Sequence, residues 1–148
     1  MNLRPFRYAD PASTGDQLQV IALWHTCGLT RPWNDPAKDI ARKRTVQPDL
    51  FLVMEDAGQI VGSAMFGFEG HRGWVNYLAV APSHQRRGLA RLLMAEGEAR
   101  LTALGCPKLS LQVRAGNAQA IAFYQHLGYA TDEVVSLGKR LIADTQAR

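Results

Sequence analysis

A glycine flanked by three arginines marks the part of this sequence that most suggests chemistry. It lies in HQRRGLARLL, residues 84–93, where a β-rich run gives way to a helical one. A helix N-terminus presents unpaired backbone N–H groups and about half a positive charge, so it attracts anions. Gly88 lets a ligand approach the backbone, and Ala90 keeps the first helical turn small. Further donors surround them: Gln85, Arg86, Arg87 and Arg91. The turn therefore predicts a site for a pyrophosphate.

The glycine spacing argues against two common carriers of that pyrophosphate. Residues 84–93 do not contain the G-x-G-x-x-G pattern of dinucleotide-binding folds, nor the G-K-[ST] of a P-loop. Nicotinamide cofactors and nucleoside triphosphates are thus disfavoured, and the anion is expected on another carrier.

Length and composition are typical of one soluble globular domain, residues 1–148. Hydrophobic residues make up 47% and charged residues 20%, and no apolar run is long enough to cross a bilayer. The start does not resemble a secretory signal, so we expect a cytoplasmic protein without a membrane partner. Cys27 and Cys106 lack metal-ligand spacing, so we expect two reduced thiols and no metal site. The net charge of +4 favours anionic partners without choosing among them.

Hydrophobic periodicity predicts alternating strands and helices, and hence an α/β domain with mixed sheet pairing. The predicted strands are Leu3–Tyr8, Leu50–Glu55, Gln59–Glu69, Gly73–Ala81, Lys108–Arg114 and Tyr129–Leu137. The predicted helices are Asp16–Cys27, Asp35 to about Val46, Gly88–Gly105 and Asn117–Leu127. Gly97 interrupts the third helix at a cost of about 1 kcal/mol relative to alanine, which indicates close packing on the sheet.

Two motifs in this order resemble the GNAT superfamily of N-acetyltransferases. Residues 85–90, QRRGLA, are similar to its Q/R-x-x-G-x-G/A signature and follow a strand of the form LAVAP. Residues 111–129, LQVRAGNAQAIAFYQHLGY, are similar to its strand, asparagine and "FY..LGY" segment. RPWNDP, EGHRG, GCPK and LSLGKRLI resemble more narrowly the bacterial YpeA-type acetyltransferases. The resemblance implies a mixed, mostly antiparallel sheet of six or seven strands, splayed near the cofactor site, with about four helices.

The resemblance also implies acetyl-coenzyme A as cofactor and an acyltransferase that acylates a primary amine. The family's pattern assigns the pyrophosphate to backbone amides of Gln85, Arg86, Arg87, Gly88, Ala90 and Arg91. It assigns the pantetheine arm to the main chain of Leu78, Ala79 and Val80, one of whose amides polarises the thioester carbonyl. Asn117 can bond that arm as well as cap its helix.

The resemblance implies direct attack by the amine on the acetyl carbon. Tyr124 occupies the tyrosine of the "FY" pair, whose hydroxyl can protonate the departing thiolate; alternatively it is a core aromatic. A base, or a water chain leading to one, must take the amine's proton. Ribosomal-protein N-terminal acetyltransferases have a glutamate where this chain has Gln112, which is no base. The role then passes to Glu69 or His71, although each can equally be a solvated loop residue.

The acceptor is left open among a peptide N-terminus, a lysine side chain and a small amine. Trp33, Asp35 and Glu69 are candidates to attract a cationic amine through ring face and charge. Trp33 and Asp35 can instead be a helix staple and cap. The oligomer is expected to be a monomer or a homodimer.

Two alternatives belong to other classes of protein. A catalytically silent sensor or scaffold would bind acetyl-coenzyme A without turnover, as the loss of a glutamate at Gln112 permits. A nucleic-acid-binding module would use Arg42, Lys43 and Arg44 with the arginines of the turn. Asp35 and Asp39 balance that charge on the same helix, so no nucleic-acid partner is expected.

Overall fold

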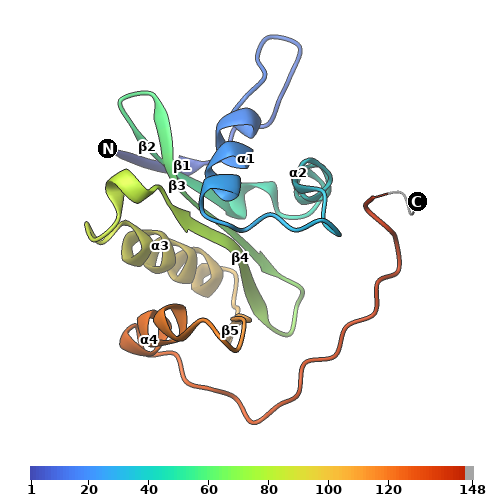
Figure 1. Cartoon of the computed structure of the whole chain (residues 1–148), viewed down its shortest axis with the longest axis vertical. Helices are drawn as coiled ribbons and strands as arrows, with labels where there is room; N and C mark the ends of the chain where they lie inside the picture. Colours follow the sequence, from blue (N-terminus) through green and yellow to red (C-terminus); the bar gives the residue numbers. More distant parts are fainter. Residues whose placement is uncertain (146–148) are drawn as a thin grey trace.

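The computed structural model describes residues 1–145 and forms a twisted sheet with helices on both faces (Figure 1). Its strands are β1 (Asn2–Pro5), β2 (Phe51–Asp56), β3 (Gln59–Phe68), β4 (Gly73–Val80) and β5 (Leu109–Ser110). Its helices are α1 (Gln17–Thr26), α2 (Pro36–Arg44), α3 (Leu89–Ala103) and α4 (Ala118–His126), with short 3₁₀ turns at Pro48–Leu50 and Pro82–His84. The four predicted helices are thus confirmed.

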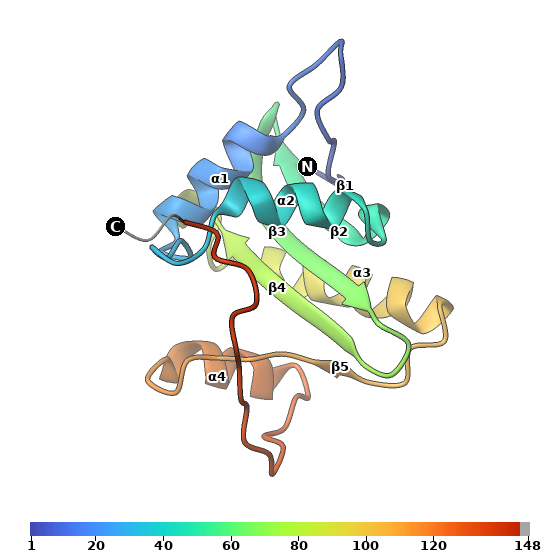
Figure 2. The ribbon, with the colours of Figure 1, turned by 90° about the vertical axis from the view of Figure 1, so that its right-hand side faces the viewer.

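The sheet has the order β1-β2-β3-β4-β5, antiparallel except for the parallel β4–β5 pair. Alternation along the strands assigns each residue to one face. Phe51 and Val53 pack with α1 and α2, whereas Leu52 packs with α3 on the opposite face. Figure 2 shows α1 and α2 on one side of β3 and β4, and α3 on the other. The mixed α/β fold is therefore confirmed.

Glycine at position 97 has the packing role that its sequence context predicts. A Cβ atom built there would lie 2.1 Å from Cζ of Phe66 in β3. A hydrogen at this position lets α3 approach the sheet closely enough to cover the Phe66 ring.

The sheet has five strands in the described residues, so the expectation of six or seven is wrong. The predicted strand Lys108–Arg114 is reduced to Leu109–Ser110, and Tyr129–Leu137 forms none. Residues 130–145, hereafter the tail, run extended from α4 toward α2 (Figures 1 and 2). Side-chain hydrogen bonds, instead of a backbone ladder, join residues 108–114 to the tail: Lys108 donates to Asp132, and Gln112 donates to Ser136. Val135 and Leu137 consequently stay 84% and 91% exposed.

The tail is held at its far end by α2. Asp144 is buried, its carboxylate accepts bonds from Arg42 and from the N–H of Asp35, and its carbonyl accepts from Lys38. The pKa of Asp144 falls to about 2, first because of the Arg42 hydrogen bond. The tail thereby spans the molecule between α4 and α2.

Candidate functional site

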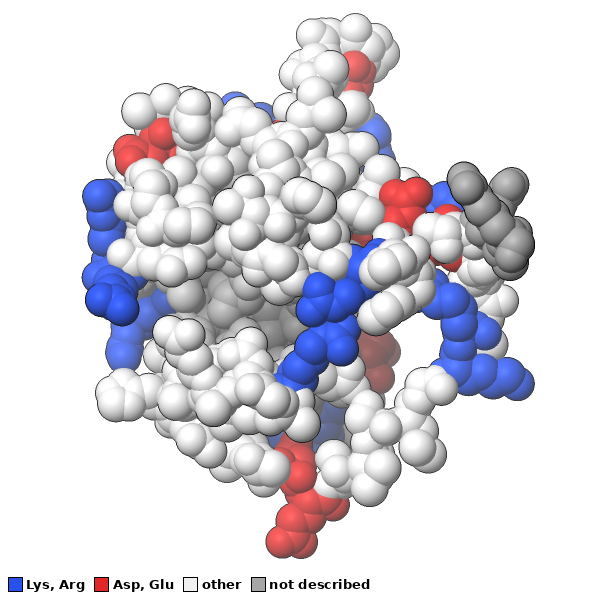
Figure 3. All heavy atoms as spheres, in the orientation of Figure 1, with Lys and Arg blue, Asp and Glu red and all other residues white. Residues whose placement is uncertain are grey.

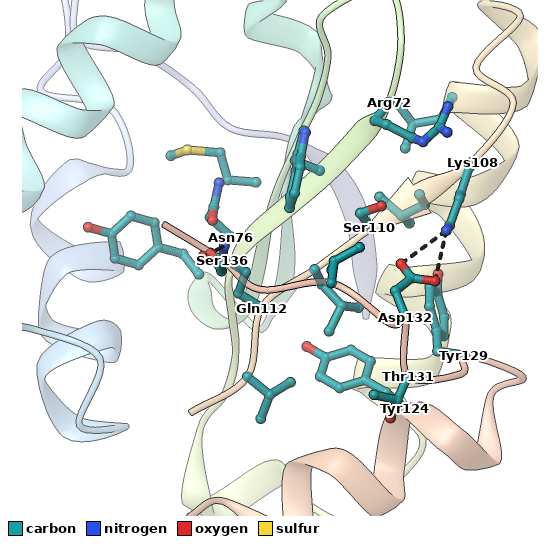
Figure 4. Close-up of a pocket in the computed structure, with 18 of the residues that line it drawn as sticks. Arg72, Asn76, Lys108, Ser110, Gln112, Tyr124, Tyr129, Thr131, Asp132 and Ser136 are labelled. Atoms are coloured by element: carbon teal, nitrogen blue, oxygen red, sulfur yellow. Dashed lines mark hydrogen bonds and ion pairs between the residues drawn. The ribbon is translucent and has the colours of Figure 1, made fainter. Parts of the chain in front are cut away.

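The sheet opens where β4 and β5 separate. These strands pair only at Gly73 with Leu109 and Trp74 with Ser110. Beyond them lies a cleft of about 2390 Å³, lined by β4, residues 109–114, α2, α4 and the tail. Figure 3 shows a hollow between the main body and α4, and Figure 4 shows polar side chains converging on the cleft. The implied splay of the sheet is thus present.

A bulge interrupts β4 next to this cleft. The register of β3 and β4 shifts between the pairs Ser63–Ala79 and Met65–Asn76, and Tyr77 has φ +56°. The buried hydroxyl of Ser63 donates to the Tyr77 carbonyl over 2.8 Å and accepts from Trp24 Nε1 over 2.9 Å. Because the peptide bond is trans, the N–H of Leu78 points away from β3 and toward the open edge. Ser63 thus orients a main-chain donor.

The remaining main-chain groups of β4 divide between its two edges. Ala81 N–H bonds the carbonyl of Val61 in β3. Since main-chain groups alternate along a strand, Ala79 also faces β3, while Leu78 and Val80 face the open edge. The carbonyl of Val80 accepts a 3.1 Å bond from Gln85 Nε2. Leu78 and Val80 are therefore placed for strand-like pairing with a ligand, and Ala79 is directed away from it.

The arginine-rich turn has the geometry of an anion cradle. Gly88 has φ +76°, and no side chain caps the N-terminus of α3. Gln85, Arg86 and Arg87 are exposed around it, and Figure 3 shows basic side chains over this edge, beside the hollow. His84 holds the turn through a 2.7 Å contact with Asp56. The amides of Ala90 and Arg91 belong to this uncapped first helical turn.

Tyr124 lines the cleft from α4, and Figure 4 shows its ring directed into it. Its ring lies 5.1 Å from Phe123 and 5.9 Å from Tyr129, in edge-to-face packing. Burial raises the pKa of Tyr124 to about 12, so its hydroxyl stays protonated at neutral pH. The Asn117 side chain accepts the Ala120 N–H, which confirms its capping role.

The two candidate bases lie away from this arrangement. Glu69 and His71 sit in the β3–β4 hairpin, exposed and outside the cleft lining. β4 spans about 26 Å between that hairpin and the arginine-rich turn. Glu69 accepts bonds from the N–H groups of Arg72 and His71, and these bonds lower its pKa. The structure does not bring either residue together with Tyr124.

The predicted acceptor residues on the α1–α2 connection have local structural roles. The Asp35 carboxylate caps α2 by accepting from the N–H groups of Ala37 and Lys38. Trp33 is 51% exposed, and the Arg114 guanidinium lies 6.0 Å from its ring centroid. Asp35 is thus a helix cap. Trp33 is the residue of the α1–α2 connection that Arg114 contacts.

Sequence reasoning missed a polar pair on the α2 side of the cleft. Tyr77 Oη donates to Asp39 Oδ2 over 2.5 Å, its ring stacks on Trp24 at 3.7 Å, and Asp39 pairs with Arg42. Burial, followed by the Asp39 hydrogen bond, raises the pKa of Tyr77. The sequence indicates Asp39 as a charge partner for the basic residues of its own helix. Its contact with Tyr77 depends on the fold, which no local pattern predicts.

Comparison with known proteins decides the family. The model of the acetyltransferase (GNAT) family matches residues 18–129, which include the turn, the bulge and α4. The chain belongs to this family. It is 48% identical over 147 residues to an acetyltransferase of Sodalis glossinidius, covering 99% of each chain.

Solved structures of GNAT proteins have the same fold. Naa20 of Chaetomium thermophilum, solved with a bisubstrate analogue, is 27% identical with a TM-score of 0.67, covering 88% of this chain and 71% of Naa20. AAC(6')-Iy, in complex with a bisubstrate analogue of coenzyme A and acetylneamine, is 17% identical with a TM-score of 0.68, covering 94% and 97%. The protein is an acyltransferase of this family, and acetyl-coenzyme A is its acetyl donor.

No helix within residues 1–145 combines the length and the apolar character needed to cross a bilayer.

Proposed function

We propose that the protein transfers the acetyl group of acetyl-coenzyme A directly to a primary amine, in a ternary complex and without an acyl-enzyme. The observation that carries this proposal is the Leu78 N–H, which Ser63 directs toward the edge where the sheet opens. Tyr124 lines the cleft, and Leu78 and Tyr124 pack against the same apolar cluster.

The arrangement fits the donor along its whole length. Its pyrophosphate would lie on the amides of the turn: Gln85, Arg86, Arg87, Gly88, Ala90 and Arg91. Its pantetheine arm would run along Leu78 and Val80 as an added strand, a mode in which main-chain bonds supply affinity. Asn117 would cap α4 and reach this arm from the opposite side.

Transfer then needs three functions from the chain. The Leu78 N–H would hold the carbonyl oxygen as negative charge develops on it. A neutral amine attacks the acetyl carbon, the new C–N bond forms and the C–S bond breaks, while Tyr124 gives its proton to the departing sulfur. The amine's proton must leave through the cleft, since Gln112 is no base. Asp39 lines the cleft, unlike Glu69 and His71, but Tyr77 and Arg42 already bond both of its oxygens.

The proposal is tested by following thiol release from acetyl-coenzyme A with peptides bearing a free N-terminus, lysine peptides and small amines. We expect acetylation of at least one class, and a fall in kcat of about a hundredfold in Tyr124→Phe. Tyr129→Phe is the matched control, because that hydroxyl bonds Glu98. Coenzyme binding without acetylation of any amine would instead identify a silent acetyl-coenzyme A-binding protein.

A further inference from the structure

The acceptor side of the cleft is basic, contrary to what its sequence suggests. Asp35 and Glu69 are both engaged by backbone N–H groups and lie outside the cleft lining. The lining on the α2 side holds Arg31, Arg42 and Lys43 with the carboxylate of Asp39. Arg42 is paired with Asp39 and Asp144, and the buried Lys43 donates to the Phe66 carbonyl, so Arg31 is the cation on this side that has no carboxylate partner within residues 1–145.

Most acidic groups that line the cleft already have partners. Asp39 is bonded by Arg42 and Tyr77, and Asp132 by Lys108. Glu98 accepts from Tyr129. Glu133, on the tail, is the remaining lining carboxylate.

Several cations of the lining, in contrast, pair with no carboxylate within residues 1–145. Arg31 donates only to the carbonyls of Gly28 and Thr30, and Arg114 lies over the Trp33 ring. Arg72 bonds the His71 carbonyl and the ring of the same histidine. Arg31 stands two residues before Trp33 in the α1–α2 connection, Arg114 lies over the Trp33 ring, and both arginines line the cleft.

The pyrophosphate of the coenzyme does not account for these charges. The proposed pyrophosphate site is the turn after β4, and none of residues 85–91 lines the cleft. Positive charge in a partly enclosed cleft raises the local concentration of anions and disfavours a purely cationic ligand.

We propose that the acceptor is a primary amine that also carries a side-chain carboxylate, which Arg31 and Arg114 bind. This inference rests on the proposed function and narrows its substrate class. The guanidinium groups suit a carboxylate because they present parallel N–H donors. Two sources share this chemistry: a free acidic amino acid, and a peptide with acidic residues close to its amino terminus.

The test compares matched acceptors that differ by carboxylate against amide. One arm uses L-glutamate and L-glutamine; the other uses a tetrapeptide amide with N-terminal alanine followed by two glutamates or by two glutamines. We expect kcat/KM to be about tenfold or more higher for the acidic member of one arm, since a charge-assisted hydrogen bond contributes about that factor. The arm that shows the preference identifies the source.

Variants connect the preference to the two arginines. We expect the preference for the acidic acceptor to fall to within about threefold in Arg114→Gln and in the double variant that adds Arg31→Gln. The control variant Arg100→Gln, in α3, should retain the preference. The Kd for acetyl-coenzyme A should stay unchanged in all of them. Thermal unfolding checks that loss of the Arg31 carbonyl bonds leaves the fold intact.

The outcomes separate this inference from the proposed function. Equal or better use of the glutamine acceptors, or a preference that survives the double variant, would overturn it. Weaker binding of acetyl-coenzyme A by the arginine variants would also overturn it, because the two arginines would then belong to the donor site. A wild type that binds the coenzyme but acetylates none of the four acceptors would overturn it as well. Failure of the wild type to bind acetyl-coenzyme A would overturn the proposed function instead.

Discussion

The hydroxyl of Ser63 in β3 donates a 2.8 Å hydrogen bond to the carbonyl of Tyr77 at the bulge of β4. This bond fixes the direction of the Tyr77 carbonyl, and hence that of the Leu78 N–H in the same trans peptide. Trp24, which donates to the same hydroxyl, connects the bulge to α1.

Ser63→Ala removes the donor and leaves Trp24 Nε1 and the Tyr77 carbonyl without their partner. We expect the free energy of unfolding to fall by about 1–3 kcal/mol, measured by urea denaturation. We also expect kcat to fall by about tenfold or more, with little change in Kd for acetyl-coenzyme A, because the displaced N–H acts on the developing oxyanion. Trp24→Phe is the control, since it keeps Ser63. An unchanged kcat in Ser63→Ala would show that the bulge has no part in the transfer step.

Tyr124→Phe changes the alkaline limb of the stability profile. Burial raises the pKa of Tyr124 from 10.0 to about 12, so the folded protein holds this proton more tightly than the unfolded chain does. The resulting stabilisation is complete below about pH 10 and is lost as pH rises toward 12. Urea unfolding across this range should show a smaller loss of stability in the phenylalanine variant. Identical slopes for the two proteins would mean that Tyr124 is not buried.

Gly97→Ala tests the contact between α3 and the sheet. Helix propensity alone would favour alanine by about 1 kcal/mol. The added Cβ would lie 2.1 Å from Phe66, so we expect a net destabilisation of about 1–3 kcal/mol and a lower Tm. Phe66→Leu in the Gly97→Ala background should recover part of it. A variant more stable than the wild type would show that the helix lies farther from β3.

Acid should release the tail from α2. Hydrogen bonding by Arg42 is the first cause of the lowered pKa of Asp144, and the stabilisation it reflects is lost as pH falls from about 4 toward about 2. The amide signal of Asp35, which donates to Asp144, should titrate in this range in NMR spectra. In Asp144→Asn that titration should be absent. Its persistence in the variant would assign it to another carboxylate.

Local signals predicted most of the fold, because they act within single elements. Asp35 followed by Pro36 is a helix start in the sequence and in the structure. The stripe of α3 and the strands β2 to β4 follow from periodicity. Residues 129–137 have strand composition, but whether they pair depends on the edge they meet, and β5 has only two residues.

The sequence predicted the parts of the candidate site whose residues are close together along the chain. The turn at Gly88 and the edge at Leu78 are adjacent in sequence, so one motif locates both. Ser63 with Tyr77 and Asp39 with Tyr77 depend on strand register and helix placement, which no local pattern encodes. That Arg31 and Arg114 line the same cleft likewise depends on the fold, which brings Arg114 over the Trp33 ring.

The most direct test of the account is a calorimetric titration with acetyl-coenzyme A of the wild type, Gly88→Val and Arg87→Glu, with Arg100→Glu as the charge-matched control. Gly88 has φ +76°, so valine there is strained as well as obstructive to a ligand. The account predicts saturable binding by the wild type and the control, and binding weakened by about tenfold or more in both turn variants. Unchanged affinity in the turn variants, or absence of binding by the wild type, would contradict it.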